Sequence, residues 1–298
     1  MEPKNLLVFL LIVIAIAYHA FWYLTERRRR RPEDGSIRPR PLALGIAFVA
    51  NFFDTLGIGS YATTTSMSKL WNVMPDEKIP GTLNVGYVMS TVVQAVIFMT
   101  IIEVEFTTLL SIIGAAVAGA FLGADIVSGF SRRQVQIGMG LALLAASALM
   151  VLSMSGQGPA PGEALGVSGA KLGIAIVISM VLGAFMMLGI GYYAPCLIMI
   201  SLLGMDPRAS YPIMMGACAF LMPSGSIQFI RKGRYHLQTA MAFLIAGPLA
   251  VLIAAPLVGA LPLFYLRILV LVVVLYTAVR MLRSAAQERA ARLPAPAA

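Results

Sequence analysis

The residues of this chain best suited to chemistry lie in two nearly identical stretches, LGIGSYA at 56–62 and LGIGYYA at 188–194. In each stretch a pair of glycines interrupts an apolar run, so we expect one helix to stop and another to begin just after the pair. The start of a helix has unpaired N–H groups and a partial positive charge, and both favour an anion. The substrate-binding residues that we predict are Gly57, Gly59, Ser60, Tyr61, Thr63 and Thr64 at the first break, and Gly189, Gly191, Tyr192, Tyr193, Pro195 and Cys196 at the second.

A simpler interpretation of these stretches is structural. Glycines permit close packing of helices, hydroxyl groups often bond to neighbouring backbone, and a single membrane cysteine such as Cys196 usually fills space. We favour a binding site because the motif occurs twice, at corresponding positions of the chain.

The elements that must position these residues are membrane helices. Of the 298 residues, 59% are hydrophobic and 12% charged, with a mean hydropathy of +0.86, whereas soluble domains are about 45–50% apolar and about 25% charged. Apolar runs of about 20 residues recur, which is the length of a helix that crosses a bilayer. The runs are continuous rather than alternating, which argues against a β-barrel. We therefore predict an all-α, polytopic membrane protein.

The net charge of +9 does not indicate a nucleic-acid partner. The basic residues lie in short segments between apolar runs, where Lys and Arg set the orientation of a protein in the lipid bilayer. Residues 5–25 are followed directly by the basic run 27–31, so we interpret them as a retained transmembrane helix rather than a cleaved signal.

The two glycine pairs belong to an internal repeat with an offset of 132 residues (188 − 56). Two prolines keep the same register, since Pro75 pairs with Pro207 and Pro80 with Pro212. Each half has an apolar segment that ends at the glycine pair, a short segment, and three longer runs. The predicted organisation is 1–40 as an N-terminal transmembrane helix with a basic loop, 41–153 as repeat 1, 154–169 as a linker, 170–283 as repeat 2 and 284–298 as a cytoplasmic tail.

The short segments 60–74 and 192–204 are too short to span a bilayer comfortably, so we interpret each as the second arm of a re-entrant hairpin. If both hairpins return to the side where they start, all of the 22 Lys and Arg residues except Lys4, Lys171, Arg208 and Arg267 face the cytoplasm. Each unit then crosses the membrane three times, so the second unit is inverted, as in many secondary transporters. We predict seven spanning helices and two hairpins in the plasma (inner) membrane, with the N-terminus outside and the C-terminus in the cytoplasm.

Polar residues inside the apolar segments mark a candidate pathway. Asp54 lies close to the first break and has Met186 as its counterpart in the second half. It is either a coupling group for a proton or sodium ion, or a gate, or a structural residue that is neutral or paired with Asn51, Lys69 or a tyrosine. The remaining pathway candidates, which could equally bond between helices, are Asn51, Asn84, Gln94 and Gln228.

The sequence lacks the residues that several other chemistries require. No Gly-x-x-x-x-Gly-Lys-Ser/Thr loop occurs, so ATP is not the expected energy source. The two histidines, His19 and His236, offer no metal cluster and no catalytic triad. We expect no cofactor, no metal and no enzymatic activity.

Two segments resemble the TauE/SafE sulfite exporter family of membrane permeases, namely FFDTLGIGSYATTTSMSKLWNVMPDEKIPGTLN and LGIGYYAPCLIMISLLGMDPRASYPIMMGACAFLMP. The duplicated Gly-rich break, the short helix and the Pro-containing turn carry this resemblance, which covers roughly residues 41–283. It implies transport of small sulfur-containing anions such as sulfite, sulfoacetate or sulfonates.

The predicted function is therefore a secondary transporter for a small oxyanion, working by alternating access around a midplane site. A passive anion channel and a carrier of another small anion, such as a carboxylate, remain alternatives. A membrane enzyme or a structural partner is a weaker alternative; an enzyme should show titratable residues clustered at one depth, and this chain does not. The oligomeric state stays open, with a homo-oligomer among the alternatives.

Overall fold

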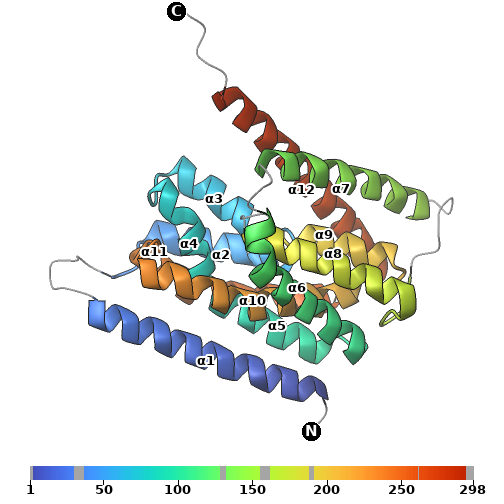
Figure 1. Ribbon diagram of the computed structural model, residues 1–298, viewed down its shortest axis with the longest axis horizontal. Coiled ribbons are helices and arrows are strands. Elements are labelled where there is room, and N and C mark those ends of the chain that lie inside the picture. The colour runs from blue at the N-terminus through green and yellow to red at the C-terminus, as the bar shows by residue number, and fades with distance from the viewer. Residues whose placement is uncertain are drawn as a thin grey trace, which may run out of the picture.

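Leu, Ile, Val, Ala and Met dominate the apolar runs, and in the computed structural model these runs form α-helices (Figure 1). The structure describes residues 3–29, 37–127, 132–154, 162–187, 191–260 and 262–292, and within these ranges it contains no β-strand. The described fold is all-α, as predicted. Its helices are α1 (Pro3–Arg29), α2 (Pro41–Thr55), α3 (Ser60–Leu70), η1 (Asp76–Lys78), α4 (Ile79–Gly86), α5 (Val88–Ile101), α6 (Phe106–Val127), α7 (Arg132–Met154), α8 (Gly169–Met187), α9 (Tyr193–Leu202), η2 (Pro207–Ala209), α10 (Ser210–Lys232), α11 (Leu237–Ala260) and α12 (Leu263–Arg292).

The order of elements repeats after α1. The first half contains α2, α3, η1, the bent pair α4–α5, α6 and α7, and the second half contains α8, α9, η2, α10, α11 and α12 in the same order. Helix α12 continues to Arg292, so the first nine residues of the predicted tail are helical. The side chain of Gln136 on α7 donates to Ser284 in that extension.

The two halves pack on each other reciprocally. Helix α6 of the first half packs against α8 of the second, and the counterparts of these helices, α11 and α2, pack in the same way. Counterparts also meet directly, α5 with α10 and α7 with α12. Each half therefore contributes the same helices to the interface between the halves.

Two glycines allow α6 and α8 to approach closely. A Cβ added to Gly119 would collide with the backbone of Met180, and one added to Gly183 would collide with the backbone of Ala116. Small residues at such crossings let membrane helices pack backbone to backbone.

By length and composition, four described helices could cross a membrane: Pro3–Arg29, Gly169–Met186, Pro207–Lys232 and Leu237–Val258. A fifth span results if α4 and α5, which meet at a 42° bend, count as one. A multi-pass membrane protein follows, with four or five clear spans among the described residues. The described segments Phe106–Leu122 of α6 and Gln136–Ala145 of α7 are shorter apolar helices, and the total of seven spans stays a prediction. Helix α8 has 19 residues and could span alone, whereas its counterpart α2 has 15.

Each short helix after a break returns to the end of the molecule where the helix before it begins (Figure 1). In the second half, Lys171 Nζ at the start of α8 donates to the Leu203 carbonyl after α9, at 2.9 Å. In the first half, burial lowers the pKa of His236, and the nearby charges of Lys78 before α4 and Arg40 before α2 lower it further.

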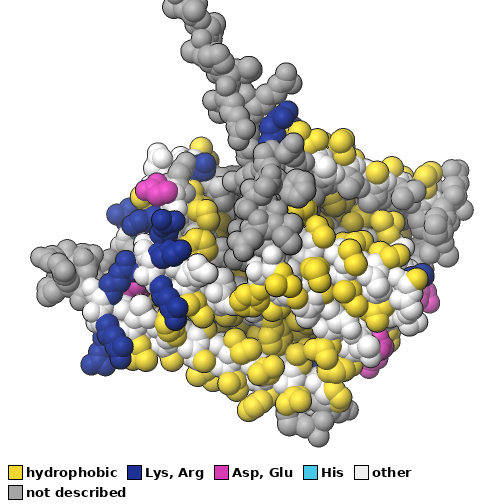
Figure 2. All heavy atoms as spheres, in the orientation of Figure 1, with side chains coloured by type: hydrophobic (Ala, Val, Ile, Leu, Met, Phe, Trp, Pro, Cys, Tyr) yellow, Lys and Arg dark blue, Asp and Glu magenta, His cyan; other side chains and the backbone are white. Residues whose placement is uncertain are grey.

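Charged side chains divide between the two ends. Figure 2 shows Lys and Arg gathered at the end occupied by α3 and α4, while hydrophobic side chains cover the middle of the molecule. At this end Arg29 Nη1 donates to the Ile230 carbonyl at 3.1 Å, and Gln238 Nε2 donates to the Arg38 carbonyl at 2.7 Å.

Candidate substrate-binding and transport site

The first break has the backbone that its glycines allow. Helix α2 ends at Thr55 and α3 begins at Ser60, and between them Gly57 and Gly59 have φ angles of +97° and +85°. Residues other than glycine rarely adopt such angles. The Gly57 N–H donates to the Asp54 carbonyl at 2.8 Å, which closes the last turn of α2.

The start of α3 is already occupied by a carboxylate of the protein itself. The Ser60 N–H donates to Asp54 Oδ1 at 2.5 Å, and Asp54 is only 4% exposed. A carboxylate at a helix N-terminus is stabilised by the free N–H groups and by the helix dipole. Asp54 thus holds the position that the sequence predicted for a bound anion.

Gln94 on α5 connects this carboxylate to the second half. Its Nε2 donates to Asp54 Oδ2 at 2.9 Å and to Thr55 Oγ1 at 3.0 Å, and its Oε1 accepts from Tyr193 OH at 3.1 Å. Gln94 is fully buried and Tyr193 is the first residue of α9. A continuous hydrogen-bonded chain therefore runs from the start of α3 to the start of α9. Asp54 is paired, but with Ser60 and Gln94 rather than with Asn51, Lys69 or a tyrosine.

Packing around Gly57 also brings the two breaks together. A Cβ added to Gly57 would lie 3.3 Å from Leu197 Cδ1 on α9 and 3.7 Å from Tyr211 OH. The phenol of Tyr211 on α10 donates to the Leu56 carbonyl, at 3.3 Å. The first break therefore lies against α9 and α10 of the other half.

The second break is described in part, since residues 188–190, and with them Gly189, lie outside the described residues. Gly191 precedes α9, and Pro195 and Cys196 are buried in its first turn. The phenol of Tyr192 forms a 2.6 Å hydrogen bond with Ser179 on α8. Tyr192 therefore braces α9 against α8, whereas Tyr193 joins the network at Asp54.

The hydroxyl and phenol groups of α3 have partners within the protein. Thr63 Oγ1 donates to the carbonyls of Gly59 and Ser60 in its own helix. Thr64 Oγ1 instead bonds Tyr87 OH at 2.7 Å, at the bend between α4 and α5. Tyr61 OH donates to Asn84 Oδ1 at 3.0 Å. The structural interpretation fits Thr63, while Thr64 and Tyr61 tie α3 to α4 and the bend.

Two pathway candidates lie outside this network. Asn51 is fully buried and donates to the Ala47 carbonyl at 2.8 Å, and its Oδ1 accepts no hydrogen bond within the described structure. Gln228 is exposed near the end of α10.

The repeat is chemically asymmetric at the centre. Met186, the counterpart of Asp54, has its Sδ 3.5 Å from the thiol of Cys218 on α10. The second half therefore has a sulfur contact where the first half has a carboxylate. Among the described residues, no group of three or more His, Cys, Asp or Glu side chains could hold a metal ion.

Comparison with known protein families gave a match. Residues 3–150 match the model of a protein family described as Sulfite exporter TauE/SafE. The chain belongs to the TauE/SafE family. The match takes in α1 and ends within α7, close to the predicted boundary of repeat 1 at residue 153. No curated protein and no solved structure matches the chain.

Membership of TauE/SafE makes the protein a membrane transporter by family, and the described centre suits that role. The groups there are hydroxyls, phenols, amides and one carboxylate, with no Lys or Arg among them. Donors of this kind can hold a small anion once Asp54 is moved or neutralised. Sequence reasoning missed Tyr87, Ser179 and Tyr211, because none of them belongs to the repeated motif.

Proposed function

We propose that this TauE/SafE protein is a secondary transporter for a small sulfur-containing oxyanion, such as sulfite, sulfoacetate or a sulfonate. The family description supports the substrate class. The observation that carries the proposal is the chain from Ser60 through Asp54 and Gln94 to Tyr193, because it joins the two helix breaks at one buried point.

In the proposed mechanism Asp54 and the substrate compete for the start of α3. Both are anions, so a substrate can take the Ser60 N–H only when the Asp54 carboxylate is displaced or protonated. Protonation also removes the repulsion between the two groups. One proton then occupies the site together with one anion, and Asp54 is the coupling group. The other titratable groups close to Asp54 are Tyr61, Tyr87, Tyr193 and Cys218, all of types that ordinarily titrate well above neutral pH.

Alternating access requires that the two halves can exchange roles. We propose that repeats 1 (41–153) and 2 (170–283) are inverted, with the α2–α3 and α8–α9 hairpins re-entering from opposite faces. The reciprocal packing of the halves and the return of each hairpin to its starting end support this arrangement. The basic end is then cytoplasmic, which leaves the N-terminus outside and the C-terminus inside.

A binding screen tests the substrate class. Sulfite, sulfate, thiosulfate, sulfoacetate and short carboxylates would be added to the purified protein in detergent, and the shift in unfolding temperature measured. A ligand that binds only the folded state stabilises it by RT ln(1 + [L]/Kd). We expect sulfite or a sulfonate to give the largest shift, and a larger shift with carboxylates would reassign the substrate.

A further inference from the structure

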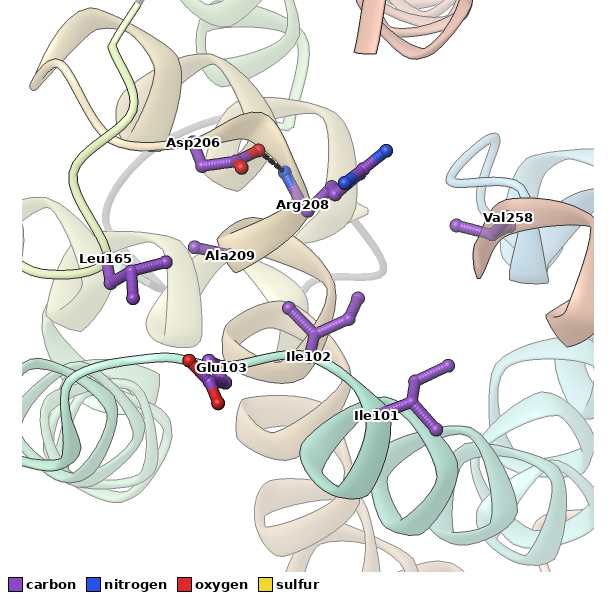
Figure 3. A pocket seen from close by; sticks show the side chains of 8 residues that line it. All are labelled: Ile101, Ile102, Glu103, Leu165, Asp206, Arg208, Ala209 and Val258. Atoms are coloured by element: carbon purple, nitrogen blue, oxygen red, sulfur yellow. Dashed lines mark hydrogen bonds between the residues drawn. The ribbon is translucent and has the colours of Figure 1, made fainter. Parts of the chain in front are cut away.

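A cavity of about 280 Å³ opens at the end of the molecule opposite the basic cluster. Figure 3 shows its lining side chains, which come from the end of α5 and the following segment (Ile101, Ile102, Glu103), from η2 and the residue before it (Asp206, Arg208, Ala209), and from Leu165 and Val258. The cavity therefore lies between the first half, through α5, and the second half, through η2 and α11.

Two hydrogen bonds join the lining of the cavity to neighbouring segments. Lys4 Nζ donates to the Ile102 carbonyl at 3.1 Å, and the Asp206 N–H donates to the Ala164 carbonyl at 2.9 Å. Lys4 and Arg208 are two of the four basic residues that the sequence assigns to the outer side. Exposed Glu103 and Leu165 put the opening at the protein surface.

One helical turn from the lining residues, Phe98 of α5 and Tyr211 of α10 pack against each other. Phe98 on α5 lies three residues before the lining residue Ile101, and Tyr211 on α10 lies two residues after the lining residue Ala209. Their ring centroids are 5.2 Å apart, and both side chains are fully buried. On the far side of this pair, Tyr211 OH bonds to the Leu56 carbonyl and lies against Gly57.

We propose that the cavity is the outer mouth of the transport path, and that Phe98 and Tyr211 form its closed gate in front of the helix breaks. The inference rests on the proposed function, and it assigns a site and two residues that the family match does not. The molecule that passes is the small anion itself. The lining carries one basic side chain, Arg208, together with the acidic side chains of Glu103 and Asp206, and Figure 3 shows all three around the cavity.

A labelling experiment tests the mouth. Ile102→Cys would be treated in intact cells with sulfonatoethyl methanethiosulfonate, a membrane-impermeant anionic thiol reagent. The unmodified protein is the blank, because Cys196 and Cys218 are both buried. The matched control is Lys232→Cys at the exposed basic end. We expect Ile102→Cys to react in intact cells and Lys232→Cys to react only after permeabilisation. The reverse pattern, or no reaction at Ile102→Cys in either condition, would overturn the assignment.

A second experiment tests the gate. Leu56→Cys places a thiol behind the aromatic pair. The same reagent would label this thiol in the protein that carries Leu56→Cys alone and in the protein that also carries Phe98→Ala. Phe243→Ala is the matched control, since Phe243 is equally buried but stacks on Tyr87 at 4.4 Å. We expect Phe98→Ala to speed labelling about two- to tenfold, because loss of the interaction between two aromatic rings corresponds to a rate change of this size. If Phe98→Ala is not recovered as folded protein, Phe98→Leu takes its place with the same expected direction.

The outcomes separate the gate from the transport function. Equal acceleration by the Phe98 and Phe243 variants would indicate general loosening and reject the gate. If the unmodified protein carries sulfite but labelling does not depend on Phe98, the gate is wrong and the function stands. If the gate result holds and no anion is carried, the transport function fails.

Discussion

Tyr193 donates a hydrogen bond to Gln94 at 3.1 Å, and this contact joins the first residue of α9 to the middle of α5 across the two halves of the protein. The other end of the same amide holds Asp54. The buried Gln94 side chain is therefore bonded to residues at both helix breaks, so it is the most informative position for mutation.

Replacement of Gln94 by leucine should impair transport by at least about tenfold and lower stability by about 1–3 kcal/mol, because Tyr193 and Asp54 lose a buried partner. Initial rates of uptake and thermal unfolding in detergent measure the two effects. Gln228→Leu is the matched control, since Gln228 is exposed on α10. Equal loss of transport in both variants would remove Gln94 from the proposed site.

Asp54→Asn should abolish the pH dependence of anion binding. If one proton binds with each anion, Kd for the anion rises about tenfold per pH unit as the pH increases above the range where Asp54 is protonated. An asparagine binds no proton, so the slope should fall to zero. Titrations between pH 5 and 8 with a simple sulfonate, an anion that binds no proton in this range, measure the slope. Glu77→Gln is the control, since Glu77 of η1 is exposed. A slope that persists in Asp54→Asn would assign the proton elsewhere.

The two threonines of α3 should respond differently. Thr64→Val removes the hydroxyl that bonds Tyr87 OH and should weaken substrate binding by about 1 kcal/mol. Thr63→Val removes only bonds to carbonyls of its own helix and should change binding by less than about 0.5 kcal/mol. Isothermal titration of both variants checks the difference. Unchanged binding in both would leave the hydroxyls of α3 without a role.

Alanine should have opposite effects at two glycines of α6. At Gly119 the added Cβ collides with the Met180 backbone, which should destabilise the protein by about 1–3 kcal/mol. At Gly114 nothing lies within 4 Å of the added atom, so the better helix former should stabilise by about 0.5–1 kcal/mol. Unfolding temperatures in the same detergent compare the two, and a similar change at both would contradict the close α6–α8 crossing.

The broad organisation was predictable because its signals are local. Apolar runs and glycine pairs each lie within a short stretch of sequence, and one such stretch recurs 132 residues later. These signals predicted all-α structure with short helices after residues 59 and 191. The bend at Tyr87 was missed. Residues 81–102 form one continuous run, and no proline marks the bend. Gly86 beside it lies against Ala240 and Phe243 of α11, a contact that sequence does not reveal.

The partners within the site could not be read from the sequence. The repeat pointed to Asp54, Ser60 and Tyr193 separately, but a helix N-terminus accepts a protein carboxylate as readily as a bound anion. Tyr211 reaches the first break from 155 residues away, and no periodicity encodes such a pairing.

The most direct test of the two-break anion site is uptake of radiolabelled sulfite into proteoliposomes under an imposed proton gradient. We expect the unmodified protein to concentrate sulfite against its own gradient, and Asp54→Asn to equilibrate it at most. Sulfite that only equilibrates with the unmodified protein, whatever the proton gradient, would indicate a passive channel and contradict coupled transport at Asp54.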